Sequence, residues 1–165
     1  MQRTRYDVAR LVGLFASSWE AVAHRMCNLG DPRMAGLPLH FLRVDAAGNV
    51  SKRYSASGLR FPAGHGSCPK WAVHAAFMPP ALITKQYSAM PDGHTYSCFA
   101  KVISQPMAGS LVRGVNYAIG LGTQAEAARA MVYADDVPRD RPVPVGLTCR
   151  FCERVDCNMR SAPSY

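Results

Sequence analysis

Three of the six cysteines in this chain fall in one short run near its end. Cys149, Cys152 and Cys157 form a C-x2-C-x4-C array, with Arg150 and Arg154 between them. Three thiolates at such a spacing can surround one inorganic centre, and neighbouring guanidinium groups offset the negative charge of the thiolates. The array therefore predicts a metal site that needs a fourth ligand from elsewhere in the chain.

Cys68 is the best candidate for the fourth ligand. Pro69 follows it, and a remote cysteine followed by proline completes the ligand set of some ferredoxin-type clusters. A zinc knuckle is disfavoured because Cys157 stands where that motif has histidine, and a zinc ribbon would need a second C-x2-C pair. The spacing leaves three alternatives open: an iron–sulfur cluster, a zinc site, and free thiols or disulfides.

Composition limits the class of protein. A chain of 165 residues with 48% apolar content suits one globular domain, and six cysteines are too few for a small disulfide scaffold. No apolar run approaches the roughly 20 residues that cross a bilayer, and Arg10 interrupts the apolar stretch near the start. We therefore expect a cytoplasmic protein with reduced thiols and no membrane contact.

The charge balance favours an anionic partner. The formal net charge is +8, and much of the positive charge lies near the two ends of the chain. Nucleic acid, a phosphorylated small molecule or an anionic cluster inside the protein would each match this excess. The alternative is a basic surface that only aids solubility.

The first thirty residues predict two helices. Apolar residues recur at helical spacing over residues 4–14, and a capping box at Ser17 and Glu20 opens a second helix that runs through Cys27. The Gly-Asp-Pro sequence at residues 30–32 is expected to end it. The pair also resembles a helix-turn-helix in which Arg25 would approach DNA. The alternative is that the apolar residues of the second helix are core.

The remainder predicts strands with two further helices. Residues 39–44 and 50–54 form a hairpin, and three later strands follow at residues 82–89, 95–103 and 115–121. One helix is expected from Pro69 to about Met78, with Cys68 as its N-cap, where the positive helix end would favour a thiolate. Another is expected between Thr123 and Tyr133, before a linker over residues 135–144.

This order of elements predicts an α+β fold. We expect an antiparallel sheet of about five strands with helices on a face, similar to sensor domains of the GAF and PAS type, with an N-terminal helical pair and a C-terminal cysteine tail. The predicted division is a helical pair at residues 1–30, an α+β domain at 31–134, and a linker with the cysteine-rich tail at 135–165. Such a fold analogy does not establish function.

Sequence patterns of catalysis are absent. The chain contains no His-Glu-x-x-His helix, Gly-x-Ser-x-Gly elbow or phosphate-binding glycine loop, so we do not expect an enzyme. Its five histidines are scattered and are expected to be surface or hydrogen-bonded residues. His65 and His74 flank Cys68, so they are the two histidines that are the best candidates for metal ligands.

Four motifs in order resemble the effector region of the short-chain fatty acid transcriptional regulators. They are RVDAAGNVSKR at residues 43–53, GHGSCPKWAVHAAF at 64–77, MPDGHTY at 90–96 and VGLTCRFCERVDC at 145–157. The likeness extends over nearly the whole chain, and the joint occurrence of the motifs is specific. Ala16 departs from the glycine expected there, and residues 158–163 depart from the expected end of the pattern without altering a cysteine.

The resemblance implies a ligand-sensing domain of bacterial transcription factors that respond to acyl-CoA thioesters. Such proteins carry a [4Fe-4S] cluster, associate through the sensor region as dimers or tetramers, and bind DNA through an upstream helix-turn-helix domain. The resemblance assigns the cluster to Cys68, Cys149, Cys152 and Cys157. Ligand occupancy and cluster integrity are then expected to bias subunit association and so reposition the DNA-binding domains. A zinc-stabilised nucleic-acid or protein interaction module is the alternative function.

A CoA-type effector would need cations for its phosphates and an apolar sleeve for the rest. Arg43, Lys52 and Arg53 on the predicted hairpin are candidates for the phosphates, and Trp71 and Tyr96, with Tyr87 and Phe99, for the sleeve. The alternative is that the cations form a solvated face and the aromatic residues are ordinary core.

Overall fold

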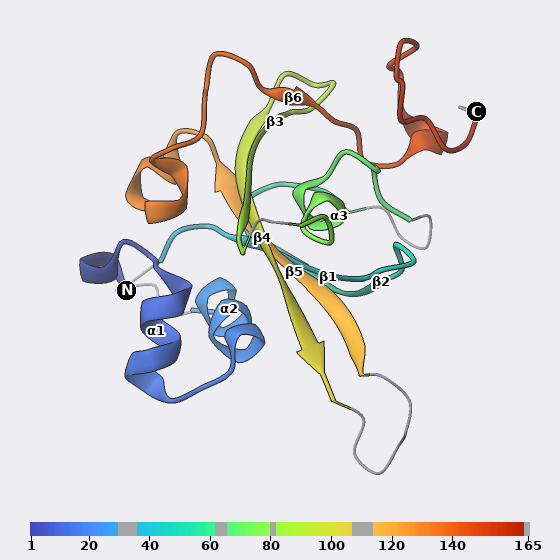
Figure 1. Cartoon of the computed structure of the whole chain (residues 1–165). Helices are drawn as coiled ribbons and strands as arrows, with labels where there is room; N and C mark the ends of the chain where they lie inside the picture. Colours follow the sequence, from blue (N-terminus) through green and yellow to red (C-terminus); the bar gives the residue numbers. More distant parts are fainter. Residues whose placement is uncertain (30–35, 62–65, 80–81, 107–113, 164–165) are drawn as a thin grey trace.

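The computed structural model describes residues 1–29, 36–61, 66–79, 82–106 and 114–163. Its centre is a six-stranded sheet in the order β2-β1-β5-β4-β3-β6 (Figure 1). The strands are β1 (His40–Asp45), β2 (Val50–Ser55), β3 (Thr84–Ala89), β4 (Thr95–Gln105), β5 (Val115–Gln124) and β6 (Val143–Pro144). The prediction of an α+β fold is confirmed.

The sheet is mixed, which corrects the prediction of about five antiparallel strands. The first five strands pair antiparallel, but Val143 and Pro144 pair parallel with Ser88 and Ala89 of β3. The sixth strand lies in the segment expected to be a linker. A two-residue strand has no alternation that a sequence pattern could reveal, because alternation needs several residues. The likeness to GAF and PAS domains stays a prediction.

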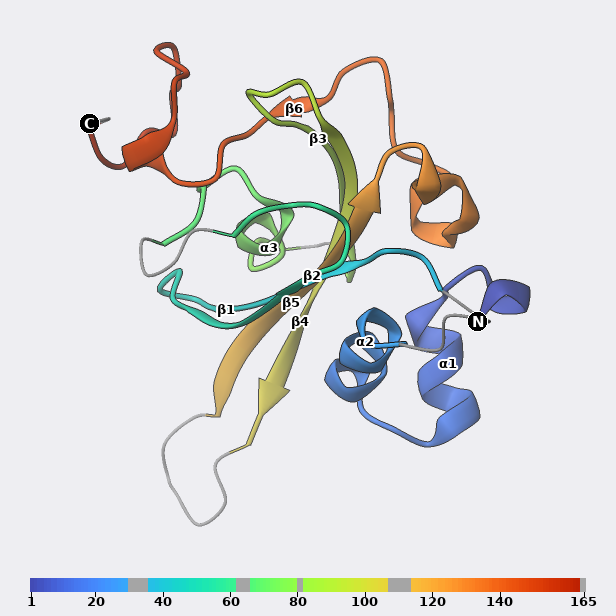
Figure 2. The same cartoon turned by 180° about the vertical axis from the view of Figure 1, so that it is seen from behind.

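Helices cover both faces of the sheet (Figures 1 and 2). The pair α1 (Val8–Phe15) and α2 (Trp19–Cys27) packs on one face, with Phe41, Phe99 and Leu121 of the strands in its core. The short helix α3 (Ala72–Ala75) packs on the other face, over Leu42 and Ala100. Successive strand residues point to opposite faces, so odd and even positions of β1 enter different cores.

The start of α2 differs from the predicted capping box. Ser18, not Ser17, is the N-cap, and its hydroxyl oxygen accepts a hydrogen bond of 3.1 Å from the backbone N–H of Ala21. Glu20 instead reaches across to the hairpin, as described below. The helix ends at Cys27 as predicted. The Gly-Asp-Pro sequence expected to stop it and the domain boundary after residue 30 lie outside the described residues. The apolar side chains of α2, among them Trp19, are buried, as the core interpretation of this helix expects.

Of the two helices predicted after the hairpin, one is shorter than expected and the other is absent. Trp71, not Cys68, precedes the first turn of α3, so Cys68 lies in the loop before the helix and is not its N-cap. In place of the predicted helix up to Tyr133, β5 continues to Gln124 and two 3₁₀ turns follow, η3 (Ala127–Ala130) and η4 (Val132–Ala134). Thr123 belongs to β5, where its hydroxyl donates to the carbonyl of Pro38 at 2.8 Å.

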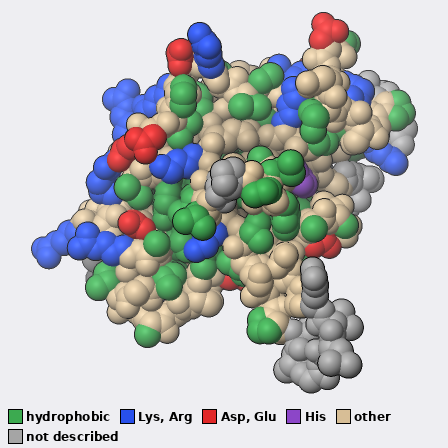
Figure 3. Space-filling view, in the orientation of Figure 1, with side chains coloured by type: hydrophobic (Ala, Val, Ile, Leu, Met, Phe, Trp, Pro, Cys, Tyr) green, Lys and Arg blue, Asp and Glu red, His purple; other side chains and the backbone are tan. Residues whose placement is uncertain are grey.

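The surface is mixed in character. In the view of Figure 3, hydrophobic side chains gather in the middle of the face, and Lys and Arg side chains lie mainly toward its edges. Within the described residues, no helix is both long enough and apolar enough to span a membrane.

Candidate metal centre and apolar pocket

The structure brings the four predicted metal ligands to one place. Cys68 from the loop before α3 and Cys149, Cys152 and Cys157 from the tail all line a single pocket. All four are free thiols; the first three are buried and Cys157 is half-buried. A donor set of four cysteine thiolates fits a [4Fe-4S] cluster, and it also fits a structural zinc ion.

The Cys68 loop is held to the start of the tail by backbone hydrogen bonds. The N–H of Cys68 donates to the carbonyl of Leu147 at 3.0 Å, and the N–H of Gly146 donates to Cys68 Sγ at 3.4 Å. A Cβ at Gly146 would lie 2.8 Å from Cys152 Sγ. Only glycine therefore allows the backbone to pass this close to a second thiol of the pocket.

Arg160 holds the tail in its folded course. Its guanidinium donates to the carbonyls of Cys149 at 3.1 Å and Cys152 at 3.3 Å, and also to the carbonyl of Arg154. Five fixed N–H donors allow one arginine to join several carbonyls. The positive charge of Arg160 lies beside the pocket, where thiolate charge would develop.

The tail is also tied to the edge of the sheet. The guanidinium of Arg154 donates to the carbonyl of Val145 at 3.1 Å and to that of Ala89, at the end of β3, at 3.0 Å. The loop that carries three of the four cysteines is therefore anchored to the same strands that support the Cys68 loop.

The thiols of the pocket differ in their electrostatic surroundings. Burial raises the pKa of Cys68, against hydrogen bonds from Gly146 and Lys70 that act to lower it. This corrects the expectation that a helix N-terminus would favour a thiolate there. For Cys149, burial acts to raise the pKa, but hydrogen bonds from the hydroxyl and backbone N–H of Ser161 outweigh it and lower the pKa.

The thiols of the cysteine pocket do not converge on a single point. Among the described residues, no three His, Cys, Asp or Glu side chains come close enough together to hold one metal ion. The four thiols instead line a pocket that is partly open to solvent and leaves about 10 Å³ for water-sized molecules. A cubane cluster binds its cysteines at separate iron atoms, so its ligands need not converge on one point.

The two histidines singled out beside Cys68 are not among the described residues lining this pocket. His74 contacts Ser67 through Nε2 at 2.7 Å, and burial lowers its pKa. His65 lies outside the described residues.

A second, apolar pocket adjoins the first. Trp71 and Tyr96, both predicted to line a cavity, do line it, together with Leu42, Phe61 and Val145. Its interior leaves about 40 Å³ for water-sized molecules. A CoA nucleotide is much larger than this space, so only a small apolar group could enter without a rearrangement.

Polar groups at the floor of this pocket are residues that the sequence did not single out. His40 Nδ1 lies 2.8 Å from Ser57 Oγ, and His40 Nε2 lies 3.6 Å from Cys98 Sγ. Burial lowers the pKa of His40 to about 3 and raises that of Cys98 to about 12, so both are neutral. Gly122 of β5 lies in register between His40 of β1 and Cys98 of β4. A glycine at this strand position is the sequence signal that could have indicated the contact between His40 and Cys98.

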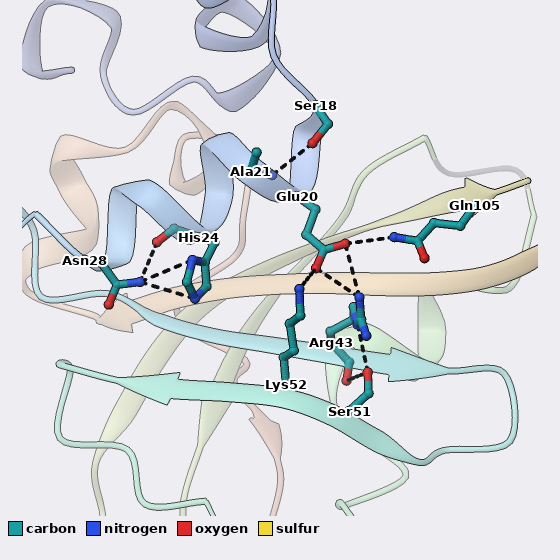
Figure 4. Close-up of polar contacts among 9 residues, drawn as sticks. All are labelled: Ser18, Glu20, Ala21, His24, Asn28, Arg43, Ser51, Lys52 and Gln105. Carbon is teal, nitrogen blue, oxygen red and sulfur yellow. Dashed lines mark hydrogen bonds and ion pairs between the residues drawn. The ribbon is translucent and has the colours of Figure 1, made fainter.

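Two of the three predicted phosphate-binding cations, Arg43 and Lys52, contact Glu20 of α2 (Figure 4). They lie on the opposite face of the sheet from Trp71 and Tyr96. The carboxylate of Glu20 accepts hydrogen bonds from Lys52 Nζ at 2.6 Å and from Arg43 at 3.1 Å, and Gln105 donates to it at 3.3 Å. The Glu20 and Arg43 side chains are only 11% and 16% exposed, whereas Lys52 is 49% exposed.

The five predicted ligand-binding residues are thus not brought together. Arg43 and Lys52 point toward α2, while Trp71 and Tyr96 line the apolar pocket beneath α3. Arg53 is exposed and pairs in register with Leu42, whose side chain lines the apolar pocket. Arg53 is therefore the one of the three hairpin cations placed on the pocket's face of the sheet.

Comparison with known proteins relates the chain to bacterial regulators. It is 43% identical over 162 residues to the propionyl-CoA carboxylase regulator of Cereibacter sphaeroides, covering 97% of this chain and 35% of that protein. It is 41% identical over 165 residues to the HTH-type transcriptional regulator PrpR of Mycobacterium tuberculosis, covering 98% of this chain and 34% of that protein. The chain spans about a third of the length of these curated relatives.

A solved structure has the same fold. A Mycobacterium tuberculosis transcriptional regulator superposes with a TM-score of 0.90 at 40% sequence identity, over 99% of this chain and 50% of that one. The sequence profile described as "Short-chain fatty acyl coenzyme A regulator, C-terminal" matches residues 28–165. The chain, cysteine tail included, therefore belongs to the short-chain fatty acyl coenzyme A regulator family and corresponds to its C-terminal region.

Proposed function

We propose that this chain is the sensor domain of a transcriptional regulator and that it holds a [4Fe-4S] cluster on Cys68, Cys149, Cys152 and Cys157. The observation that carries the proposal is the convergence of these four thiols on one pocket although a long stretch of chain separates the first from the others. The family and the regulatory names of the relatives support the regulator role.

The tail supplies a means of coupling the cluster to assembly. Phe151, Val155 and Met159 are 62%, 86% and 48% exposed, and they flank the cysteines. Exposed apolar side chains clustered on one segment are typical of interaction surfaces. A bound cluster would fix the tail and these side chains, and its loss would release them. Subunit association and the position of an upstream DNA-binding domain would then depend on the cluster.

The effector in this proposal is CoA or a short-chain acyl-CoA. The apolar pocket would receive only the short acyl group, because its interior is small. Arg53 lies on the pocket's face of the sheet and would be the cation for the phosphates outside it. Arg43 and Lys52 point toward α2 on the other face of the sheet, which makes them weaker candidates.

Anaerobic purification followed by metal and sulfide analysis tests the cluster. The expected result is a brown protein with a broad visible absorption band and equal amounts of iron and acid-labile sulfide. A colourless protein that binds zinc would overturn the proposal in favour of a zinc-stabilised interaction module.

Calorimetric titration tests the effector. Propionyl-CoA is expected to bind more tightly than CoA, and Arg53→Ala is expected to weaken both, because the phosphates are common to the two ligands. Lys52→Ala is the matched control on the same strand and is expected to change affinity less. Equal affinity of the wild type and Arg53→Ala would remove Arg53 from the site.

A further inference from the structure

Trp71 stands in the wall between the two pockets. Its indole ring lines the apolar pocket, and its Nε1–H donates to the carbonyl of Gly146 at 2.8 Å. Gly146 lines the cysteine pocket, and its own N–H donates to Cys68 Sγ at 3.4 Å. One side chain and the backbone of one residue, Gly146, therefore connect the apolar pocket to a thiol of the cysteine pocket.

Neighbouring residues of this wall also contact both pockets. Val145 lines the apolar pocket, while the next residue, Gly146, lines the cysteine pocket. The N–H of Trp71 donates to the carbonyl of Cys68 at 3.0 Å, and the N–H of Val145 donates to the carbonyl of Ala89 at 3.0 Å. A displacement of the indole would therefore move the Cys68 loop and the start of the tail together.

We propose that Trp71 is a positioning residue that couples the two pockets. Its indole N–H fixes Gly146, and through it the thiol of Cys68, in the place that retains the cluster. A short acyl group in the apolar pocket packs against the ring and holds the indole on the carbonyl of Gly146. It thereby raises the affinity of the site for the cluster and slows the loss of the cluster. By linkage, the cluster strengthens binding of the acyl group by the same factor. This inference rests on the proposed function.

The chain offers a matched control in its other tryptophan. Trp19 is equally buried, but it lies on the opposite face of the sheet, and its Nε1 has no hydrogen-bond partner in the described part of the structure. Phe at either position keeps an aromatic ring and removes one indole N–H. Trp71→Phe therefore removes a hydrogen bond, whereas Trp19→Phe removes none.

The first experiment compares cluster retention. The wild type, Trp71→Phe and Trp19→Phe are reconstituted anaerobically, and iron release to a chelator is followed by visible absorption. Trp71→Phe is expected to release iron about fivefold faster, as the loss of one hydrogen bond would allow. Its reduction potential is also expected to shift, because hydrogen bonds to cluster sulfurs help to set it. A general loss of stability would not move that potential, and Trp19→Phe is expected to match the wild type in both measurements.

The second experiment uses Trp71 as a reporter. The chain has two tryptophans, so Trp19→Phe leaves Trp71 as the only indole. Propionyl-CoA is expected to change its fluorescence in the cluster-free protein and to slow iron release in the cluster-bound protein. CoA without an acyl group is expected to do neither.

The outcomes separate this inference from the proposed function. Equal iron release and equal potential in Trp71→Phe and Trp19→Phe, with a cluster present in the wild type, would overturn the role of Trp71 and leave the cluster proposal intact. Iron release that propionyl-CoA leaves unchanged would overturn the coupling. A wild type that binds no iron would overturn the proposed function and this inference with it.

Discussion

The carbonyl of Cys149 accepts a hydrogen bond of 3.1 Å from the guanidinium of Arg160, eleven residues further along the tail. The same guanidinium also bonds the carbonyl of Cys152, so one side chain closes the loop that carries three of the four proposed ligands. The tail is thus shaped by hydrogen bonds of its own and does not depend on a metal for every contact.

Loss of Arg160 is expected to loosen the tail. Arg160→Ala removes several charge-assisted hydrogen bonds, so retention of the cluster should fall about tenfold or more. Arg160→Lys keeps the charge but cannot join the carbonyls in the same way, and it should be intermediate. Iron content after reconstitution measures the effect. Arg141→Ala, at a side chain that is 90% exposed, is the control and should behave as wild type.

Cysteine substitutions separate ligands from core residues. Cys68→Ser is expected to abolish stable cluster binding, because it removes the proposed ligand that comes from outside the tail. Cys98→Ser changes a thiol of the apolar pocket and should leave the iron content unchanged. Iron and sulfide analysis of the two reconstituted variants measures how much cluster each one holds. Equal iron content in Cys68→Ser and Cys98→Ser would contradict the proposed ligand set.

The ion pairs of Glu20 are expected to stabilise the fold. Glu20→Ala leaves the nearly buried charge of Arg43 without this partner, so the free energy of unfolding should fall by about 2–4 kcal/mol. Urea unfolding of the cluster-free protein measures it. In a double-mutant cycle with Arg43→Ala, the two effects should not add, because each variant breaks the same contact. Additive effects would show that the pair is not coupled.

Burial of His40 predicts acid sensitivity. Its pKa is about 3 in the folded protein and 6.5 ordinarily, so below pH 6.5 the unfolded state binds a proton that the folded state does not. The contribution to stability is complete above pH 6.5 and is lost as the pH falls toward 3, by about 1.4 kcal/mol per pH unit. Urea unfolding at pH 7 and pH 5 should show a smaller pH dependence for His40→Gln than for wild type. His94→Gln, at an exposed histidine, should keep the wild-type dependence.

Gly122 is predicted to tolerate no side chain. A Cβ there would lie 2.5 Å from His40 Nε2 and 2.8 Å from the carbonyl oxygen of Ser97, so Gly122→Ala should destabilise the fold by about 1–3 kcal/mol. Gly13 in α1 has no atom within 4 Å of its Cβ position, so Gly13→Ala should instead stabilise the helix by about 0.5–1 kcal/mol. Thermal unfolding of the two variants would reveal the opposite signs.

The sequence predicted the five long strands with small errors at their ends, because each has enough residues for alternation or for a turn signal to be recognised. Its errors fall where the pattern is short or ambiguous. Ser17 and Ser18 are adjacent and both could cap α2, and only the packing of Glu20 against the hairpin distinguishes them. The two-residue strand β6 exists only through its pairing with Ser88 and Ala89.

The cysteine spacing by itself selected the four thiols, because ligand number and the Cys68-Pro69 pair are local chemical facts. Only the tertiary structure decided which other predicted residues share a site. Alternation along β1 sends Arg43 toward α2 and Leu42 toward the apolar pocket, so cations and aromatic residues close in sequence lie on opposite faces of the sheet. The contact between Trp71 and Gly146 likewise depends on how the Cys68 loop meets β6, a long-range relationship that no local pattern encodes.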